Sequence, residues 1–312
     1  MPKRIALGTI PGVGWRAADI ASVAQQAEAA GFEAIFAAEV NNDVLATVQL
    51  MGAATHTIKV GSWVTNIYLR HSYLCAKHAA LIADATDGRL ILGLGVSHQP
   101  VNRALGIEMP EPIEALRSYT VDVINWLKGE GPATHLPQAP AVQPVPIHLG
   151  ALTSRSVELA GELADGVMPF LWSAERVAGS KAWGTRGRGK APTRERLEIA
   201  LGLPIFVGDD VARSIEVARN NLGLFASLPF FQRLLRVSGF EQEAAMAEAG
   251  GGPASLSDRF LDAVCLIGPL GRCHERLAAF TEAGVDLPIL MPAVDLASVR
   301  TTIEAVRSWV SV

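Results

Sequence analysis

Polar side chains that could take part in chemistry stand directly after three apolar runs of this 312-residue chain. A carboxylate and an imidazole in such places can exchange protons, and short hydroxyl and amide groups can hydrogen-bond the ring of an organic ligand. Because ligands bind at the carboxyl ends of parallel strands, we expect these groups to share one site. They are Glu39, Thr65, Asn66, Ser97 and His98.

A further candidate is the segment Gly150–Arg155, which joins an apolar run to an amphipathic stretch. Thr153 or Ser154 can cap a helix here, and the free N–H groups of a helix N-terminus attract anions. Arg155 adds a positive charge that suits a phosphate group. The alternative interpretation is a plain helix cap with Arg155 in a surface ion pair.

Two interpretations stay open for several of these residues. Glu39 is either a general acid or base, or a carboxylate paired with Arg or Lys inside the mouth of the fold. His98 either faces a ligand or has a structural role. Trp63, at the end of an apolar run, is either a wall of the site or part of the core. Gly95 allows the backbone to approach a ligand closely.

The elements that must position these residues alternate along the whole chain. Apolar runs typical of buried strands are separated by amphipathic stretches typical of helices, such as Ala17–Ala30 and Ser72–Asp87. Eight parallel strands with intervening helices predict a TIM (β/α)8 barrel with insertions, and a doubly wound sheet is the alternative. The predicted strands are Ile5–Leu7, Ala34–Ala38, Ile58–Val64, Leu90–Val96, Ile147–Leu149, Gly166–Phe170, Leu197–Val207 and Asp286–Met291.

Composition limits the possible classes of protein. Hydrophobic residues make up 49% of the chain, enough for one large core, and no linker divides it, so we expect a single domain over residues 1–312. A net charge of −4 argues against nucleic-acid binding. No signal peptide or membrane-length apolar run is present, so we expect a cytosolic protein. Cys75, Cys265 and Cys273 lack metal-site spacing, which predicts reduced, partly buried thiols.

Several phrases of the sequence together resemble one protein family. The chain lacks the dinucleotide, P-loop, zinc-protease and nucleophile-elbow motifs. It is instead similar to the luciferase-like monooxygenase family, and within it to the branch that uses coenzyme F420, a deazaflavin hydride carrier. The phrases that carry this resemblance are AEAAGFEAIFAAE, VGSWVTN, DGRLILGLGVSH, PVPIHLGALTSRSVELAGELADGV and GVDLPILMP.

The resemblance implies a TIM barrel with the cofactor at its mouth. It implies a bulge with a non-prolyl cis peptide at Ser62–Trp63 that backs the ring, and a phosphate held by the segment after residue 149. Catalytic roles are predicted for Glu39 and His98, although Val40 follows Glu39 where many deazaflavin-dependent members have His. The implied cofactor contacts are Ser62, Trp63, Thr65, Asn66, Gly95, Val96, Ser97, Gly150, Ala151, Leu152, Thr153 and Arg155.

Three functional hypotheses follow. The first is hydride transfer between coenzyme F420 and a hydrophobic organic substrate, the second is an FMN-dependent monooxygenase that uses molecular oxygen, and the third is a barrel that binds the cofactor without catalysis. The basic segment 186–190 is interpreted as an exposed loop that could screen the acidic tail of coenzyme F420. A homodimer through the Ala- and Leu-rich stretches Val44–Ala54 and Ser72–Asp87 is also predicted.

Overall fold

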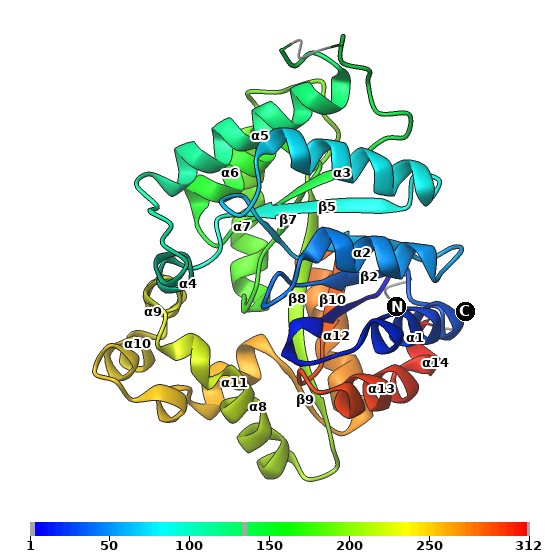
Figure 1. Ribbon diagram of the computed structural model, residues 1–312. Coiled ribbons are helices and arrows are strands. Elements are labelled where there is room, and N and C mark those ends of the chain that lie inside the picture. Colours follow the sequence, from blue (N-terminus) through cyan, green and yellow to red (C-terminus); the bar gives the residue numbers. More distant parts are fainter. Residues whose placement is uncertain (1–3, 133–135, 311–312) are drawn as a thin grey trace.

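Eight parallel strands close into a barrel in the computed structural model, which describes residues 4–132 and 136–310 (Figure 1). The last strand pairs with both its predecessor and the first strand, which closes the ring and excludes the doubly wound alternative. The predicted TIM barrel is therefore confirmed. Its strands are β1 (Ala6–Thr9), β2 (Ala34–Ala37), β3 (Lys59–Ser62), β5 (Leu90–Gly95), β6 (Ile147–Gly150), β7 (Gly166–Met168), β8 (Glu198–Val207) and β10 (Leu287–Met291).

Two short strands depart from the predicted pattern. The run Ile58–Val64 is not one strand, because β3 ends at Ser62 and β4 (Thr65–Asn66) resumes the pairing with β5. The break holds a cis peptide bond between Trp63 and Val64, so the prediction of a cis bond at Ser62–Trp63 is wrong by one residue. β9 (Leu266–Gly268) pairs with the carboxyl end of β8, beyond the part that pairs with β10.

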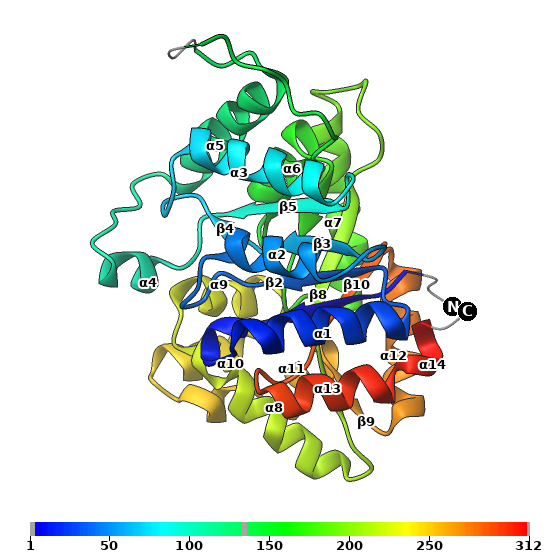
Figure 2. The same cartoon turned by 45° about the vertical axis from the view of Figure 1, so that its right-hand side comes forward.

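Helices cover the outside of the barrel (Figure 2). Capping residues set their ends, as where the Asp43 side chain accepts N–H hydrogen bonds at the start of the second helix. The surrounding helices are α1 (Ala17–Ala30), α2 (Val44–Ala53), α3 (Ser72–Ala85), α5 (Pro112–Lys128), α6 (Ser154–Leu163), α7 (Ala174–Arg188), α12 (Leu270–Ala283) and α13 (Leu296–Ala305). Shorter elements are η1 (Pro11–Val13), α4 (Gln99–Ala104) and α14 (Arg307–Val310).

An inserted group of helices lies between β8 and β10. The stretch 209–248 is divided into three helices, with breaks before Pro229 and at Gly239. Gly239 has a φ of 82°, a conformation that favours glycine. The group consists of α8 (Val211–Ala226), α9 (Pro229–Val237), α10 (Glu241–Glu248), η2 (Gly252–Ser255) and α11 (Asp258–Val264).

The basic segment 186–190 is not an exposed loop, so that interpretation is wrong. Residues up to Arg188 are in α7, which packs closely on α6, because a Cβ at Gly161 would lie 2.6 Å from the Gly184 carbonyl oxygen. Arg186 pairs with Glu158, while Arg188 donates to carbonyls at the end of α6. Both side chains therefore have partners within the protein, at the end of α7 that lies away from the barrel mouth.

The barrel interior is apolar near its middle and charged at its amino end. The interior cluster is formed by Ala6, Ala34, Phe36, Ile91, Met168, Ala200, Leu287, Ile289 and Met291. Below it, Glu198 contacts His148 at 3.2 Å and Arg4 at 2.6 Å. All three cysteines are buried and free, as predicted. Within the described residues no helix is long and apolar enough to cross a membrane.

Candidate functional site

The bulge between β3 and β4 shapes the barrel mouth. Ser62 Oγ donates to the Gly93 carbonyl at 2.9 Å and accepts from the Gly93 N–H at 3.0 Å, while Thr65 Oγ1 donates to Ser62 Oγ at 2.9 Å. Ser62 and Thr65 are both fully buried. Their hydroxyl groups therefore join the bulge to β5, and the cofactor contacts expected of Ser62 and Thr65 stay predictions.

The two residues of the cis peptide bond face opposite sides of the mouth. Trp63 crosses the barrel toward β8, where a Cβ at Gly202 would lie 2.5 Å from its indole ring. Val64 turns the other way, where a Cβ at Gly95 would lie 2.4 Å from its side chain. Gly95 is thus needed for close packing within the protein. Val64 was not predicted as a site residue, because in the sequence it is only the last residue of the apolar run Ile58–Val64.

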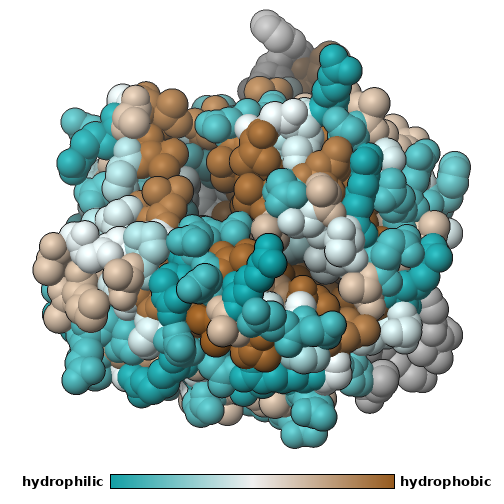
Figure 3. Space-filling view, turned by 90° about the horizontal axis from the view of Figure 1, so that it is seen from below, coloured by the Kyte–Doolittle hydropathy of each residue, from teal (hydrophilic) through white to brown (hydrophobic). Residues whose placement is uncertain are grey.

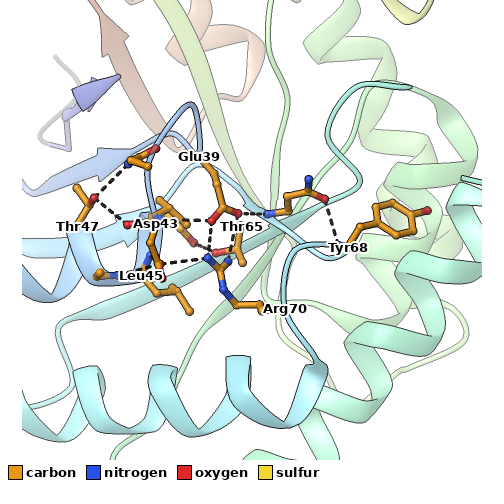
Figure 4. Close-up of polar contacts among 12 residues, drawn as sticks. Glu39, Asp43, Leu45, Thr47, Thr65, Tyr68 and Arg70 are labelled. Atoms are coloured by element: carbon orange, nitrogen blue, oxygen red, sulfur yellow. Dashed lines mark hydrogen bonds and ion pairs between the residues drawn. The ribbon is translucent and has the colours of Figure 1, made fainter. Parts of the chain in front are cut away.

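Glu39 is the centre of a buried ion-pair network (Figure 4). Its side chain is 3% exposed and pairs with Arg70, which is 10% exposed and also lies 3.1 Å from Asp43. The backbone N–H groups of Asn66 and Val44 also donate to Glu39, at 2.6 and 3.4 Å. Burial by itself lowers the pKa of Arg70, but the hydrogen bond and charge of Glu39 outweigh it and raise that pKa.

Every neighbour of the Glu39 carboxylate in this network is a hydrogen-bond donor. The arrangement matches the second interpretation left open by the sequence, a carboxylate paired with a cation at the mouth. Arg70 was not identified from the sequence, because 31 positions separate it from Glu39. By holding the Asn66 backbone, Glu39 supports the strand that follows the bulge.

His98 lies at the mouth against the inserted helices. Its ring stacks on Phe230 of α9, with ring centroids 4.4 Å apart and an interplanar angle of 4°. Burial lowers the pKa of His98, which favours a neutral imidazole. No side chain or backbone group in the described residues hydrogen-bonds this imidazole. It is therefore available to exchange a proton with a ligand.

A pair of buried amides holds the loop that carries His98. Asn66 Nδ2 donates to Asn102 Oδ1 at 2.8 Å, and Asn102 Nδ2 donates to the Val96 carbonyl at 3.0 Å. Ser97, with a φ of 56°, is half-buried between Val96 and His98. Asn66 thus positions the predicted contacts Val96 and Ser97, while its own side chain is 3% exposed and engaged within the protein.

The segment before α6 is the best-suited anion site among the predicted residues. Thr153 caps the helix and shares a capping box with Ser156. Arg155 is exposed and has no ion pair in the part of the chain that the structure describes, so the surface ion pair considered as an alternative is not observed. Gly150 adjoins Val64, and Ala151 and Leu152 lead from there to the helix.

Aromatic side chains from distant segments complete the mouth. Trp63 contacts Phe170, Phe170 contacts Phe225, and ring centroids are 5.1 Å apart in both pairs. Phe225 also meets the edge of His98 at 6.5 Å. We call Trp63, Phe170, Phe225, Phe230 and His98 the aromatic wall. Phe170 ends a predicted strand and could have been found, whereas Phe225 and Phe230 have no sequence pattern that marks them.

These features suit a flat organic cofactor with an anionic tail. The Trp63–Val64 bulge and the aromatic wall offer apolar surface for a ring, and the α6 N-terminus with Arg155 offers positive charge for a phosphate. No cluster of residues able to hold a metal ion occurs in the described ranges. Figure 3 shows hydrophobic side chains also exposed on the underside of the molecule, around a hollow and between hydrophilic ones.

The model of the luciferase-like monooxygenase family matches residues 4–287, which is most of the chain. The chain belongs to the luciferase-like monooxygenase family. The predicted flavin- or deazaflavin-dependent oxidoreductase class is confirmed with it. The bulge, the Glu39 network and the α6 N-terminus described above are thus parts of a luciferase-like barrel.

Individual relatives cover most of this luciferase-like chain. A 5,10-methylenetetrahydromethanopterin reductase of Methanolobus tindarius is 26% identical over 294 residues, 85% of this chain and 87% of its own length. A Mycobacterium tuberculosis protein described as a coenzyme F420-dependent oxidoreductase is 26% identical over 315 residues, 86% of this chain and 89% of its own.

Solved structures share the fold at lower sequence identity. The coenzyme F420-dependent tetrahydromethanopterin reductase of Methanopyrus kandleri has a TM-score of 0.81 with 18% identity and 97% coverage of both chains. The oxygenating constituent of a Pseudomonas putida 3,6-diketocamphane monooxygenase, solved with FMN, has a TM-score of 0.71 with 17% identity and 98% coverage of both. These likenesses establish the fold of the luciferase-like chain and leave the choice of cofactor to other observations.

Proposed function

We propose that this luciferase-like enzyme binds coenzyme F420 at the barrel mouth and transfers a hydride between it and an apolar organic substrate. The observation that carries the proposal is the joint placement of the α6 N-terminus with its unpaired Arg155, the Trp63–Val64 bulge and the aromatic wall along one mouth. The name of the Mycobacterium tuberculosis relative, which is matched over more than four fifths of this chain, supports the deazaflavin branch. When bound, this cofactor supplies the hydride chemistry.

The protein's own residues orient the reactants and move a proton. The α6 N-terminus and Arg155 hold the anionic tail, and the bulge supports the ring. His98 holds or releases a proton at an imidazole nitrogen, beside a substrate oxygen. It is the better-placed group for that step because its imidazole is free and Glu39 is engaged by donors. Glu39 then acts as a positioning residue through Asn66.

The aromatic wall sets the class of substrate. Its rings exclude water from the space beside His98, which favours an uncharged, largely hydrophobic molecule with one alcohol or carbonyl group. A strongly charged substrate would lose hydration there without gaining a partner from the wall. Within this proposal, the wall contributes binding and shape, and His98 contributes the proton.

Separate titrations with coenzyme F420 and FMN test the proposal. We expect tighter binding of coenzyme F420, and an Arg155→Ala variant that binds it more weakly while staying folded. Tight FMN binding without measurable F420 binding would overturn the proposal and favour the FMN-dependent monooxygenase, a function supported by the FMN-bound structural neighbour. Turnover of uncharged alcohols and ketones, followed by F420 absorbance, separates an enzyme from a barrel that binds its cofactor without catalysis.

A further inference from the structure

Arg176, in the first turn of α7, carries a positive charge that no acid among the described residues balances. Its guanidinium lies against the rings of both Trp172 and Trp183, 5.1 and 5.3 Å from their centroids. It has no carboxylate partner in the described residues, and its Nε is buried without a hydrogen bond. Burial lowers the pKa of Arg176, which shows that desolvation acts on the group without an opposing ion pair. Burying an unpaired cation costs free energy, so we expect Arg176 to have a role other than packing.

The hydrogen bonds of Arg176 reach two different parts of the mouth. One Nη donates to the Leu152 carbonyl at 2.7 Å, and the other donates to the Val237 carbonyl at 3.2 Å. Leu152 belongs to the segment Gly150–Thr153, which we call the anion loop. Val237 is the last residue of α9, and a cation at a helix C-terminus is favourable. One rigid guanidinium therefore joins the anion loop to α9.

The opposite end of α9 reaches the proton-exchanging residue. Phe230, in the first turn of α9, stacks on His98. The helix is nine residues long, and α4 begins directly after His98. A displacement of Val237 relative to the anion loop would thus move the ring that covers His98. The chain of contacts runs from the anion loop through Arg176 and α9 to His98.

We propose that Arg176 is a positioning residue that couples the anion loop to α9, so that an anionic cofactor tail in the loop also orders the helix covering His98. This inference rests on the proposed function for the presence of the anionic tail. A glutamine amide is shorter and has both of its donors on one nitrogen, so it does not span the two carbonyls as the guanidinium does, and only a cation is also drawn toward the anion. Lysine would keep the charge but would not span both carbonyls with a fixed fork.

Amide hydrogen exchange of the full-length protein tests the coupling. Without ligand, we expect Arg176→Gln to speed exchange in both α9 and the anion loop by about tenfold or more, because hydrogen bonds from a charged donor are lost in each. Arg236→Gln is the matched control. Arg236 lies on the same helix, and its ion pair with Glu248 is exposed, so exchange in the anion loop should not change.

Addition of coenzyme F420 or FMN completes the test, since both carry a phosphate. The wild type should gain protection in the anion loop and in α9, whereas Arg176→Gln and Arg176→Lys should gain it in the loop alone. Equal protection of α9 in wild type and variants would overturn the coupling. If neither cofactor protects the wild-type loop, the proposed function fails, while the exchange measured without ligand still decides whether Arg176 holds both segments.

Discussion

The buried ion pair between Arg70 and Glu39 allows a quantitative prediction about the stability of the protein around the site. Arg70→Met removes the cation and leaves the Glu39 carboxylate, 3% exposed, with only two backbone N–H donors. Breaking one partner of a buried pair typically costs about 3–5 kcal/mol, because the remaining charge stays buried. We expect a loss of that size in the free energy of unfolding, a large part of the roughly 5–15 kcal/mol of a typical domain.

Removing both charges should cost less than removing one. Glu39→Gln keeps the shape and lets the Asn66 N–H donate to an amide oxygen, so the double variant with Arg70→Met should recover about 2 kcal/mol or more relative to Arg70→Met alone. Reversible urea unfolding of the four proteins measures this cycle. The exposed pair of Arg236 and Glu248 is the control, since Arg236→Met should cost less than about 1 kcal/mol.

Two results would refute the reasoning. The first is an Arg70→Met variant that loses no more stability than Arg236→Met, which would mean that the Glu39 carboxylate is hydrated and not buried. The second is simple additivity of the two substitutions, which would mean that the pair does not interact. Either result would also remove Glu39 from its role as support for Asn66 and the loop that Asn66 holds.

Three further predictions concern chemistry, pH and assembly. His98→Ala should lose turnover by about 100-fold or more while still binding cofactor, and a Glu39→Gln variant that loses equal turnover at unchanged stability would make Glu39 the acid instead. Burial alone would raise the pKa of Glu198, but hydrogen bonds and charge from His148 and Arg4 outweigh it and lower that pKa to about 2. A carboxyl with a lowered folded-state pKa stabilises above its ordinary value of 4.5, so this contribution should be lost as pH falls from about 4.5 toward about 2. A plot of the urea unfolding midpoint against pH should be flatter for Glu198→Gln than for the wild type over that range. Equal slopes for the two proteins would contradict this role of Glu198. If the protein is a homodimer through α2 and α3, Leu81→Asp should make it dissociate into monomers, because Leu81 is 55% exposed on α3 and the substitution would place a charge in the interface. Light scattering that gives a monomer mass for the wild type at micromolar concentration would count against the dimer.

The sequence by itself determined the alternation of elements and the general location of the site. Apolar runs set the eight barrel strands to within a few residues, because a strand buried on both faces must be apolar along its length. Polar residues directly after those runs had to lie at one mouth, because parallel strands end on the same side. The resemblance in motifs such as VGSWVTN was enough to identify the family, which the family model confirmed.

The tertiary structure alone decided which side chains meet. Glu39 was assigned as an acid from its position, and its pairing with Arg70 depended on a loop 31 residues away. The basic segment 186–190 looked like a loop because of its glycines, yet one of them, Gly187, allows α7 to pack closely on α6. Close approach between helices is a property of both partners, so one segment read alone does not reveal it.

The same reason explains the bulge and the wall. Local pattern predicted an unbroken strand over Ile58–Val64, and the resemblance implied a cis bond at Ser62–Trp63, whereas the cis bond lies at Trp63–Val64, where Val64 packs against Gly95 and the indole crosses to Gly202. Phe230 stacks on His98 although 132 positions separate them, since the inserted helices return to the mouth only after the barrel has closed. Local propensity and periodicity place elements, whereas contacts between distant segments depend on packing that no short stretch of sequence contains.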